Sequence, residues 1–291
     1  MSTEKRMSNW LEQWQQLTKA SLSIKDKQLF KEELARFLGH HSTIQTAILL
    51  GAQSDSTGSA FLSGYQSALR CIKVPLAANQ WAALVVSEKG IKNPKQMKSR
   101  LRADKGKLLI DGEKSYAMLL GQGLDQLIVI VKDEQEQLVS LLLDANQNAI
   151  EVVESSVTKY FPDIPHASLR FNQLAVADSD ILSSNAHHEI NKPFRYWEDM
   201  HVSVALLSWA AKRVDDAAVL LEHIDDLEQS FQSSPDYYQL EIIEKIDQTL
   251  ELIDRASEYF DSVDKDAWMR DRDMFLFGKN IRSLISSRLK Q

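Results

Sequence analysis

The middle of the chain carries a block of short strand-like segments between two helical regions, and this order limits the possible folds. From residue 81 to 182, apolar runs rich in β-branched residues alternate with polar turns. The runs read AALVV, KLLI, QLIVIV, QLVSLLL, AIEVVE and SLRFNQLAV. Because no helical segment separates them, we expect antiparallel pairing in a barrel or sandwich rather than a doubly wound parallel sheet.

Helical patterns dominate on the N-terminal side of this block. Ser23 and Asp26 have the spacing of a capping box before KDKQLFKEELARFLG, a segment that closes on Gly39. The helical character continues through residues 43–50 and 60–72. We therefore expect a shortened N-terminal helical region over residues 1–79.

The C-terminal side is also helical. Pro193 suits the first turn of a helix of about thirty residues, in which apolar residues recur every three or four positions from Trp197 to Leu221. Ser234 and the following proline predict the start of another helix, and Asp264 predicts the cap of a last one. The sequence thus predicts an α+β chain with a middle β domain at 80–183 and an antiparallel helical bundle at 184–291.

Glycine scarcity excludes several nucleotide-binding designs. The chain has ten glycines in 291 residues and none between Gly123 and Gly278. Neither a P-loop nor a complete G-x-G-x-x-G turn occurs. A kinase-like or Rossmann nucleotide site is therefore not expected.

Net charge and cysteine content further restrict the kind of protein that this chain can be. The net charge of −7 opposes general nucleic-acid binding, and no apolar stretch reaches the length of a membrane span. The single Cys71 excludes internal disulfides, and the N-terminal residues contain no apolar core of a signal peptide. Neither histidine pair, 40–41 or 187–188, has further ligands at metal-binding spacing. We expect a cytoplasmic protein without a metal site.

Short sequence motifs, in the order in which they occur along the chain, resemble those of the acyl-CoA dehydrogenases. The strand ending in Ser87-Glu88 resembles the family strand that ends in [ST]-E-P-x-x-G-S-D. The segment 112–116, GEKSY, is similar to the family's G-x-K-x-[WY]-I-T, and 169–182 resembles L-x-F-D-D-V-x-V-P-x-x-x-L-L-G. Near the end, Arg270-Asp271 resembles the R-D pair before the last helices of the family.

The resemblance implies a flavoprotein of fatty acid metabolism. It implies FAD as hydride acceptor, an acyl-CoA-like thioester as substrate, α,β-dehydrogenation as the reaction, and a homodimer or homotetramer. By position in the family pattern, Ser87, Glu88, Tyr116 and Met118 are the cofactor-binding candidates. A carboxylate in a water-poor site would remove the α-proton.

Several family positions depart from the pattern. Lys89 to Pro94 stand where the family has P-x-x-G-S-D, and Met118 stands where a flavin-contacting threonine belongs. The R-x-x-F-G word that contacts FAD from a neighbouring subunit does not follow Arg213. Residues 274–291 contain no Asp or Glu, so the usual C-terminal catalytic glutamate is absent.

Some relatives carry the base on the first long bundle helix instead. Asp199, or Glu198 if the alignment shifts by one, is the catalytic candidate there. Acidic residues in the first turns of a helix also simply complement its dipole. Three alternatives stay open: a dehydrogenase impaired by loss of the usual base, a non-catalytic scaffold or partner subunit without FAD, and a flavin-dependent monooxygenase or nitroalkane-oxidising relative.

Overall fold

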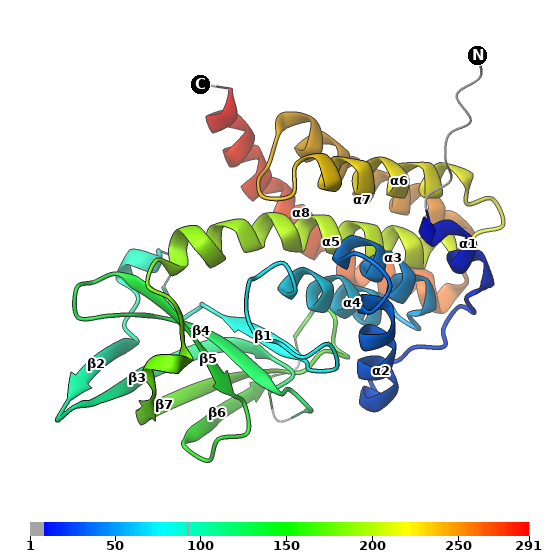
Figure 1. The fold of residues 1–291 in the computed structure, drawn as a ribbon. Helices are drawn as coiled ribbons and strands as arrows, with labels where there is room; N and C mark the ends of the chain where they lie inside the picture. Colours follow the sequence, from blue (N-terminus) through cyan, green and yellow to red (C-terminus); the bar gives the residue numbers. More distant parts are fainter. Residues whose placement is uncertain (1–8, 92, 121, 157, 291) are drawn as a thin grey trace. The chain divides into compact units, whose positions relative to one another are not determined.

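The computed structural model describes residues 9–290 except 92, 121 and 157, and the chain divides into two compact units (Figure 1). The helical unit contains the chain up to Ala68, residues 159–161, and the chain from Tyr196 onward. The sheet unit contains Leu69–Thr158 and Pro162–Arg195. The helical unit is therefore built from both ends of the chain, and the sheet unit is inserted between them.

The helices begin and end as follows: α1 Asn9–Gln16, α2 Lys27–Leu38, α3 Thr43–Gln53, α4 Thr57–Leu69, α5 Lys192–Ala211, α6 Ala218–Ser233, α7 Leu240–Ala256 and α8 Ser262–Leu289. Side-chain caps set several of the starts. Asp26 accepts a hydrogen bond from the backbone N–H of Leu29, and Ser42 and Gln45 form a capping box on α3. The expected Ser23 cap is wrong, because the helix begins three residues later at the carboxylate.

The expected thirty-residue helix after Pro193 is also wrong, because the apolar repeat runs through two helices. α5 ends at Ala211 and α6 begins at Ala218. Asp215 and Asp216 follow the end of α5, where negative charge opposes the helix dipole. Asp216 accepts from the N–H of Ala218 at 3.1 Å, which favours a new helix start there.

The last two helices also start at residues other than those expected. α7 begins at Leu240, five residues after Pro235, whose carbonyl accepts from the Trp197 indole N–H. Asp261, not Asp264, caps α8, and its carboxylate accepts from the N–H of Asp264.

Two glycines allow close helix packing inside the helical unit. A Cβ on Gly51 of α3 would lie 2.3 Å from the carbonyl oxygen of Ala205, and one on Gly64 of α4 would lie 2.5 Å from the Cα of Val202. These distances leave no room for a side chain, so both contacts of α5 are backbone to backbone.

The described residues of the sheet unit form eight strands: β1 Ala82–Val85, β2 Arg100–Asp104, β3 Lys107–Met118, β4 Gln126–Lys132, β5 Leu138–Asp144, β6 Ile150–Ser156, β7 His166–Val176 and β8 Ile181–Ser183. The ladder runs β6-β7-β3-β2-β4-β5-β8, and β1 pairs with β4. Most pairs are antiparallel, as expected, but β4 pairs in parallel with both β1 and β2. The order has two ends, so the sheet is not a closed barrel.

Buried side chains fill the sheet unit as the apolar runs predict. Leu127 to Val131 of β4 are all buried, so the side chains on both faces of this strand are covered. The predicted α+β class, with helices before and after a mainly antiparallel sheet, is confirmed.

Candidate functional site

The sheet unit brings the predicted cofactor-binding residues Ser87 and Tyr116 close together. The N–H of Ser115 donates to the carbonyl of Ser87 at 2.8 Å. The β3–β7 register shifts between Lys114 and Ala117, and Tyr116 sits at this irregularity with a φ of 61°. A positive φ is costly for a bulky residue and occurs where surrounding structure enforces it. The Tyr116 side chain is 66% exposed, and Ser87 is also exposed.

Glu88, by contrast, is fully engaged inside the sheet unit. Its two carboxylate oxygens accept from the backbone N–H groups of Lys98 at 2.7 Å and Ser99 at 3.0 Å. The Lys114 ammonium lies 2.9 Å from the same carboxylate and 3.2 Å from the carbonyl of Val86. Glu88 therefore fixes a loop to β3 and has little capacity left for a ligand.

The pKa values of this pair follow from its burial. Burial lowers the pKa of Lys114 to about 8, although Glu88 partly offsets that effect. For Glu88, burial acts to raise the pKa, but the Lys98 N–H and the Lys114 ammonium together bring it below its usual value. A lysine with no exposed surface, held by one carboxylate, is a structural ion pair that is costly to break.

The fourth cofactor-binding candidate, Met118, is half-buried and lies in register with His166 of β7. Its thioether is only a weak acceptor and cannot donate a hydrogen bond. Ser87 and Glu88 line a cavity of about 90 Å³, whereas ligand pockets span roughly 300–1,000 Å³. Among the four candidates, the hydroxyls of Ser87 and Tyr116 can both donate and accept hydrogen bonds.

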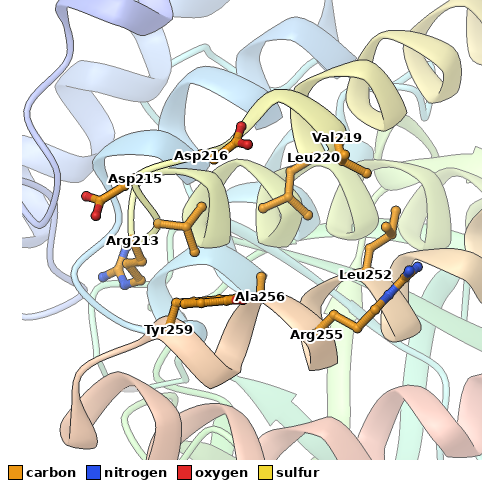
Figure 2. Close-up of a pocket in the computed structure, with 10 residues that line it drawn as sticks. Arg213, Asp215, Asp216, Val219, Leu220, Leu252, Arg255, Ala256 and Tyr259 are labelled. Atoms are coloured by element: carbon orange, nitrogen blue, oxygen red, sulfur yellow. The ribbon is translucent and has the colours of Figure 1, made fainter.

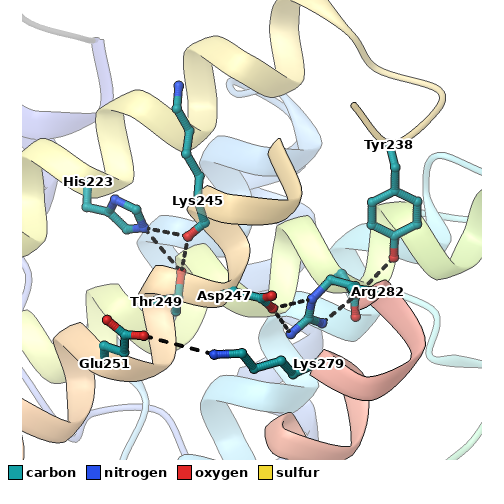
Figure 3. A network of polar contacts seen from close by, with 9 residues as sticks. His223, Tyr238, Lys245, Asp247, Thr249, Glu251, Lys279 and Arg282 are labelled. Atoms are coloured by element: carbon teal, nitrogen blue, oxygen red, sulfur yellow. Dashed lines mark hydrogen bonds and ion pairs between the residues drawn. The ribbon is translucent and has the colours of Figure 1, made fainter. Parts of the chain in front are cut away.

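The catalytic candidate Asp199 lies in a buried polar network of the helical unit. The Tyr238 hydroxyl donates to its carboxylate at 2.6 Å, and the Arg282 guanidinium donates to the same oxygen at 3.0 Å. Arg282 also donates to Asp247 at 2.8 Å. Figure 3 shows Arg282 of α8 between Asp247 of α7 and the Tyr238 hydroxyl. We call these four residues the Arg282 network.

The Arg282 network pairs the Asp199 carboxylate with a buried guanidinium. The side chains of Arg282 and Asp199 are 6% and 11% exposed. Burial alone would lower the pKa of Arg282, but the two carboxylates raise it above its usual value. This geometry holds α5, α7 and α8 together, and one oxygen of the Asp199 carboxylate accepts from two donors.

Glu198 precedes Asp199 on α5 and is half-buried. Adjacent residues of a helix point roughly 100° apart, so the two carboxylates do not share one direction. The structure therefore does not bring Glu198 and Asp199 together as a pair.

A larger pocket, of about 580 Å³, lies between α6, α7 and the segment 213–216 that precedes α6. Figure 2 shows Tyr259 on one side of it, opposite Val219 and Leu220 of α6. Leu252 and Arg255 of α7 also line it. One indirect sign of this pocket is present in the sequence, the aspartate pair 215–216 that precedes α6.

Arg213, which also lines the pocket, is committed to structure. Its guanidinium lies 2.8 Å from the Asp264 carboxylate and donates to the carbonyls of Ser54 and Asp55. It also stacks over Trp209, with 4.2 Å from Cζ to the ring centroid. The R-x-x-F-G motif of the family does not follow Arg213, and this arginine instead connects several segments of the helical unit.

The part of the chain that the structure describes contains neither a candidate metal site nor a candidate membrane span. Within residues 9–290, apart from the three gaps, no group of three or more His, Cys, Asp or Glu side chains could hold a metal ion. No helix in the same part of the chain combines the length and apolar character of a bilayer span.

Comparison with known proteins shows the fold. The sequence matches no family model and no curated protein. Among solved structures, butyryl-CoA dehydrogenase from Megasphaera elsdenii is similar at a TM-score of 0.68 and 10% identity, covering 97% of this chain and 98% of that one. The prolyl acyl carrier protein oxidase AnaB gives 0.70 and 13%, covering 91% and 89%.

A glutaryl-CoA dehydrogenase from Mycobacterium smegmatis in complex with FADH2 is similar at a TM-score of 0.62 and 12% identity, covering 94% of this chain and 86% of that one. The chain therefore has the fold of the acyl-CoA dehydrogenases. Its similarity extends over nearly the whole length of these proteins, in agreement with the resemblance of the sequence words.

Proposed function

We propose that this chain is a non-catalytic protein of the acyl-CoA dehydrogenase fold, which acts in the cytoplasm as a scaffold or partner subunit. The observation that carries the proposal is the Arg282 network. Asp199 accepts from Tyr238 and Arg282 in a buried site, so the carboxylate of the best candidate for the α-proton base is engaged in the packing of three helices.

Two further features support the loss of dehydrogenase chemistry. Residues 274–291 contain no carboxylate that could replace Asp199. On the sheet unit, Glu88 is bound by Lys98, Ser99 and Lys114, and Met118 offers a thioether. A protein that kept this fold without selection for catalysis is expected to lose both the catalytic base and the flavin contacts.

A second candidate function is an active, FAD-dependent dehydrogenase acting on an acyl-CoA-like thioester. The exposed side chains of Ser87 and Tyr116, joined through the Ser115–Ser87 hydrogen bond, favour it. In that case Glu198, which lies outside the Arg282 network, would be the base. FAD would supply the hydride acceptor.

One experiment decides between the two functions. The purified protein is incubated with excess FAD and desalted, and its visible absorption spectrum is recorded before and after addition of butyryl-CoA under anaerobic conditions. The proposal expects no retained flavin absorption. Retained flavin that is bleached by the thioester would overturn it.

Single-residue variants then test the role of each candidate side chain. If flavin is retained, Tyr116→Phe and Ser87→Ala are expected to weaken its retention, and Glu198→Gln is expected to stop bleaching while leaving retention intact. Flavin that is retained but reacts with oxygen after chemical reduction, and not with the thioester, would instead favour the oxygenase alternative.

A further inference from the structure

The pocket of about 580 Å³ in the helical unit has the size and the lining of a small-molecule site. Such sites usually span roughly 300–1,000 Å³ and combine apolar walls with a few polar groups. Leu220 of α6 and Leu252 of α7 supply apolar wall, and Tyr259 lies opposite α6 (Figure 2). The Tyr259 side chain is 80% exposed, so its ring is accessible to a ligand. We call this cavity the α6–α7 pocket.

Two aspartates supply negative charge to the lining of the α6–α7 pocket. Asp215 and Asp216 both line it and both are exposed. Asp216 uses one carboxylate oxygen to accept from the N–H of Ala218 at 3.1 Å, which leaves its second oxygen for a ligand. The Arg213 guanidinium lies 2.8 Å from the Asp264 carboxylate, so this arginine is already paired. The two aspartates are therefore available to meet a cation.

The charge of the surrounding helices favours the same kind of ligand. Residues 215–261, which include α6 and α7, contain fourteen Asp or Glu and two Lys or Arg. Such an excess of one sign attracts cations and repels anions. Arg255 also lines the pocket, and Figure 2 shows it on the side away from the two aspartates. We therefore expect the charged end of a ligand beside the aspartates and its apolar body toward Leu252.

We propose that the α6–α7 pocket binds a small organic cation with an apolar body. The carboxylates of Asp215 and Asp216 attract its ammonium group, and the face of the Tyr259 ring adds a cation–π contact. The apolar body packs against Leu220 and Leu252. A ligand that carries phosphate would meet like charge at the aspartates. The proposal goes beyond the scaffold role and does not depend on whether FAD is retained.

The first test separates the charge of the ligand from its shape. Three naphthalene probes share one ring system: the cation 1-naphthylmethylammonium, the neutral 1-naphthalenemethanol and the anion 1-naphthylacetate. Each is titrated into the full chain by isothermal titration calorimetry at pH 7 and low ionic strength, where screening is weak. The cation is expected to bind about 10-fold more tightly than the alcohol, because each exposed charge or cation–π contact contributes about 2- to 5-fold in affinity. The anion is expected to bind most weakly.

The second test removes the two carboxylates. Asp215→Asn/Asp216→Asn keeps the shape of both side chains and an acceptor for the Ala218 N–H. It is expected to weaken binding of the cation by about 5-fold or more and to change that of the alcohol by less than about 2-fold. The matched control, Glu222→Gln/Glu244→Gln, removes the same charge from exposed positions of α6 and α7 outside the pocket lining. It is expected to change the affinity for either probe by less than about 2-fold.

The third test examines the other two polar side chains of the pocket. Tyr259→Leu removes the ring and is expected to weaken binding of the cation more than that of the alcohol. Tyr237→Leu changes a tyrosine that is 66% exposed and lies outside the pocket lining, so it serves as the control. Arg255→Gln removes the positive charge and is expected to strengthen binding of the cation by about 2-fold and to weaken that of the anion. Circular dichroism checks that each variant is folded.

Several results would overturn the proposal. They are a cation that binds no more tightly than the alcohol, an aspartate variant that keeps the full affinity for the cation, and an Arg255→Gln variant that binds the cation more weakly. Tightest binding of 1-naphthylacetate would assign the pocket to an anion instead. Retention of FAD is measured by absorption without these probes and tests the proposed function alone, so the two failures are distinguishable.

Discussion

Replacement of Arg282 by methionine tests whether Asp199 is structural. The guanidinium is the cation that the carboxylates of Asp199 and Asp247 share, and the side chains of Arg282 and Asp199 are 6% and 11% exposed. Arg282→Met keeps the length of the side chain but leaves two carboxylates without a cation. Breaking a buried pair in this way costs about 3–5 kcal/mol, and for a protein of this size that corresponds to roughly 6–20 °C in Tm.

The assay is urea unfolding followed by far-ultraviolet circular dichroism at pH 7, with a thermal scan alongside. Arg288→Met, at an exposed position of the same helix, serves as control and is expected to change the free energy of unfolding by less than about 0.5 kcal/mol. The triple variant Asp199→Asn/Asp247→Asn/Arg282→Met removes all three charges and is expected to recover most of the loss. An Arg282→Met cost no larger than that of the control, or a triple variant as unstable as the single one, would refute the reasoning.

Three further predictions concern buried groups. The pKa of Lys114 is lowered from 10.5 to about 8, so between pH 8 and pH 10.5 the unfolded chain binds more protons than the folded one. The free energy of unfolding should therefore rise with pH over that window, and Lys114→Met should abolish the rise. The pKa of the buried His201 is lowered to about 4 from 6.5, so stability should fall as pH drops through that window, and His201→Gln should reduce the difference in urea midpoint between pH 7.5 and pH 5. Gly64→Ala should destabilise by about 2 kcal/mol or more, because its Cβ would lie 2.5 Å from the Cα of Val202, whereas Gly39→Ala meets nothing nearer than 3.4 Å and should change the melting temperature little.

The sequence predicted those parts of the fold that depend on neighbouring residues. Alternation and β-branched content placed the strands between Ala82 and Ser183, and the helical repeat placed helices on both sides. The break between α5 and α6 was missed because the apolar repeat continues through it. The parallel pairing of β1 with β4 was missed because register between distant strands is set by tertiary packing.

The candidate site was less predictable because its chemistry depends on contacts between distant residues. Asp199 and Arg282 are 83 positions apart, and no local pattern marks them as partners. Glu88 and Lys114 are 26 positions apart, and their pairing follows from the strand arrangement of the sheet unit. The sequence motifs thus indicated candidate positions, while the hydrogen-bond partners and the exposure of each side chain required the structure.

The insertion of the sheet unit between two halves of the helical unit affects how the chain emerges from the ribosome. The Trp14 indole donates to Ser208, 194 residues later, and α3 is buried at every position from Thr46 to Ala52. During synthesis, α3 therefore waits without its α5 partner until the whole sheet unit has been translated and can already have folded. Over that interval the apolar side chains of α3 lack the cover that α5 later provides, and slower translation after residue 195 would lengthen their exposure to aggregation.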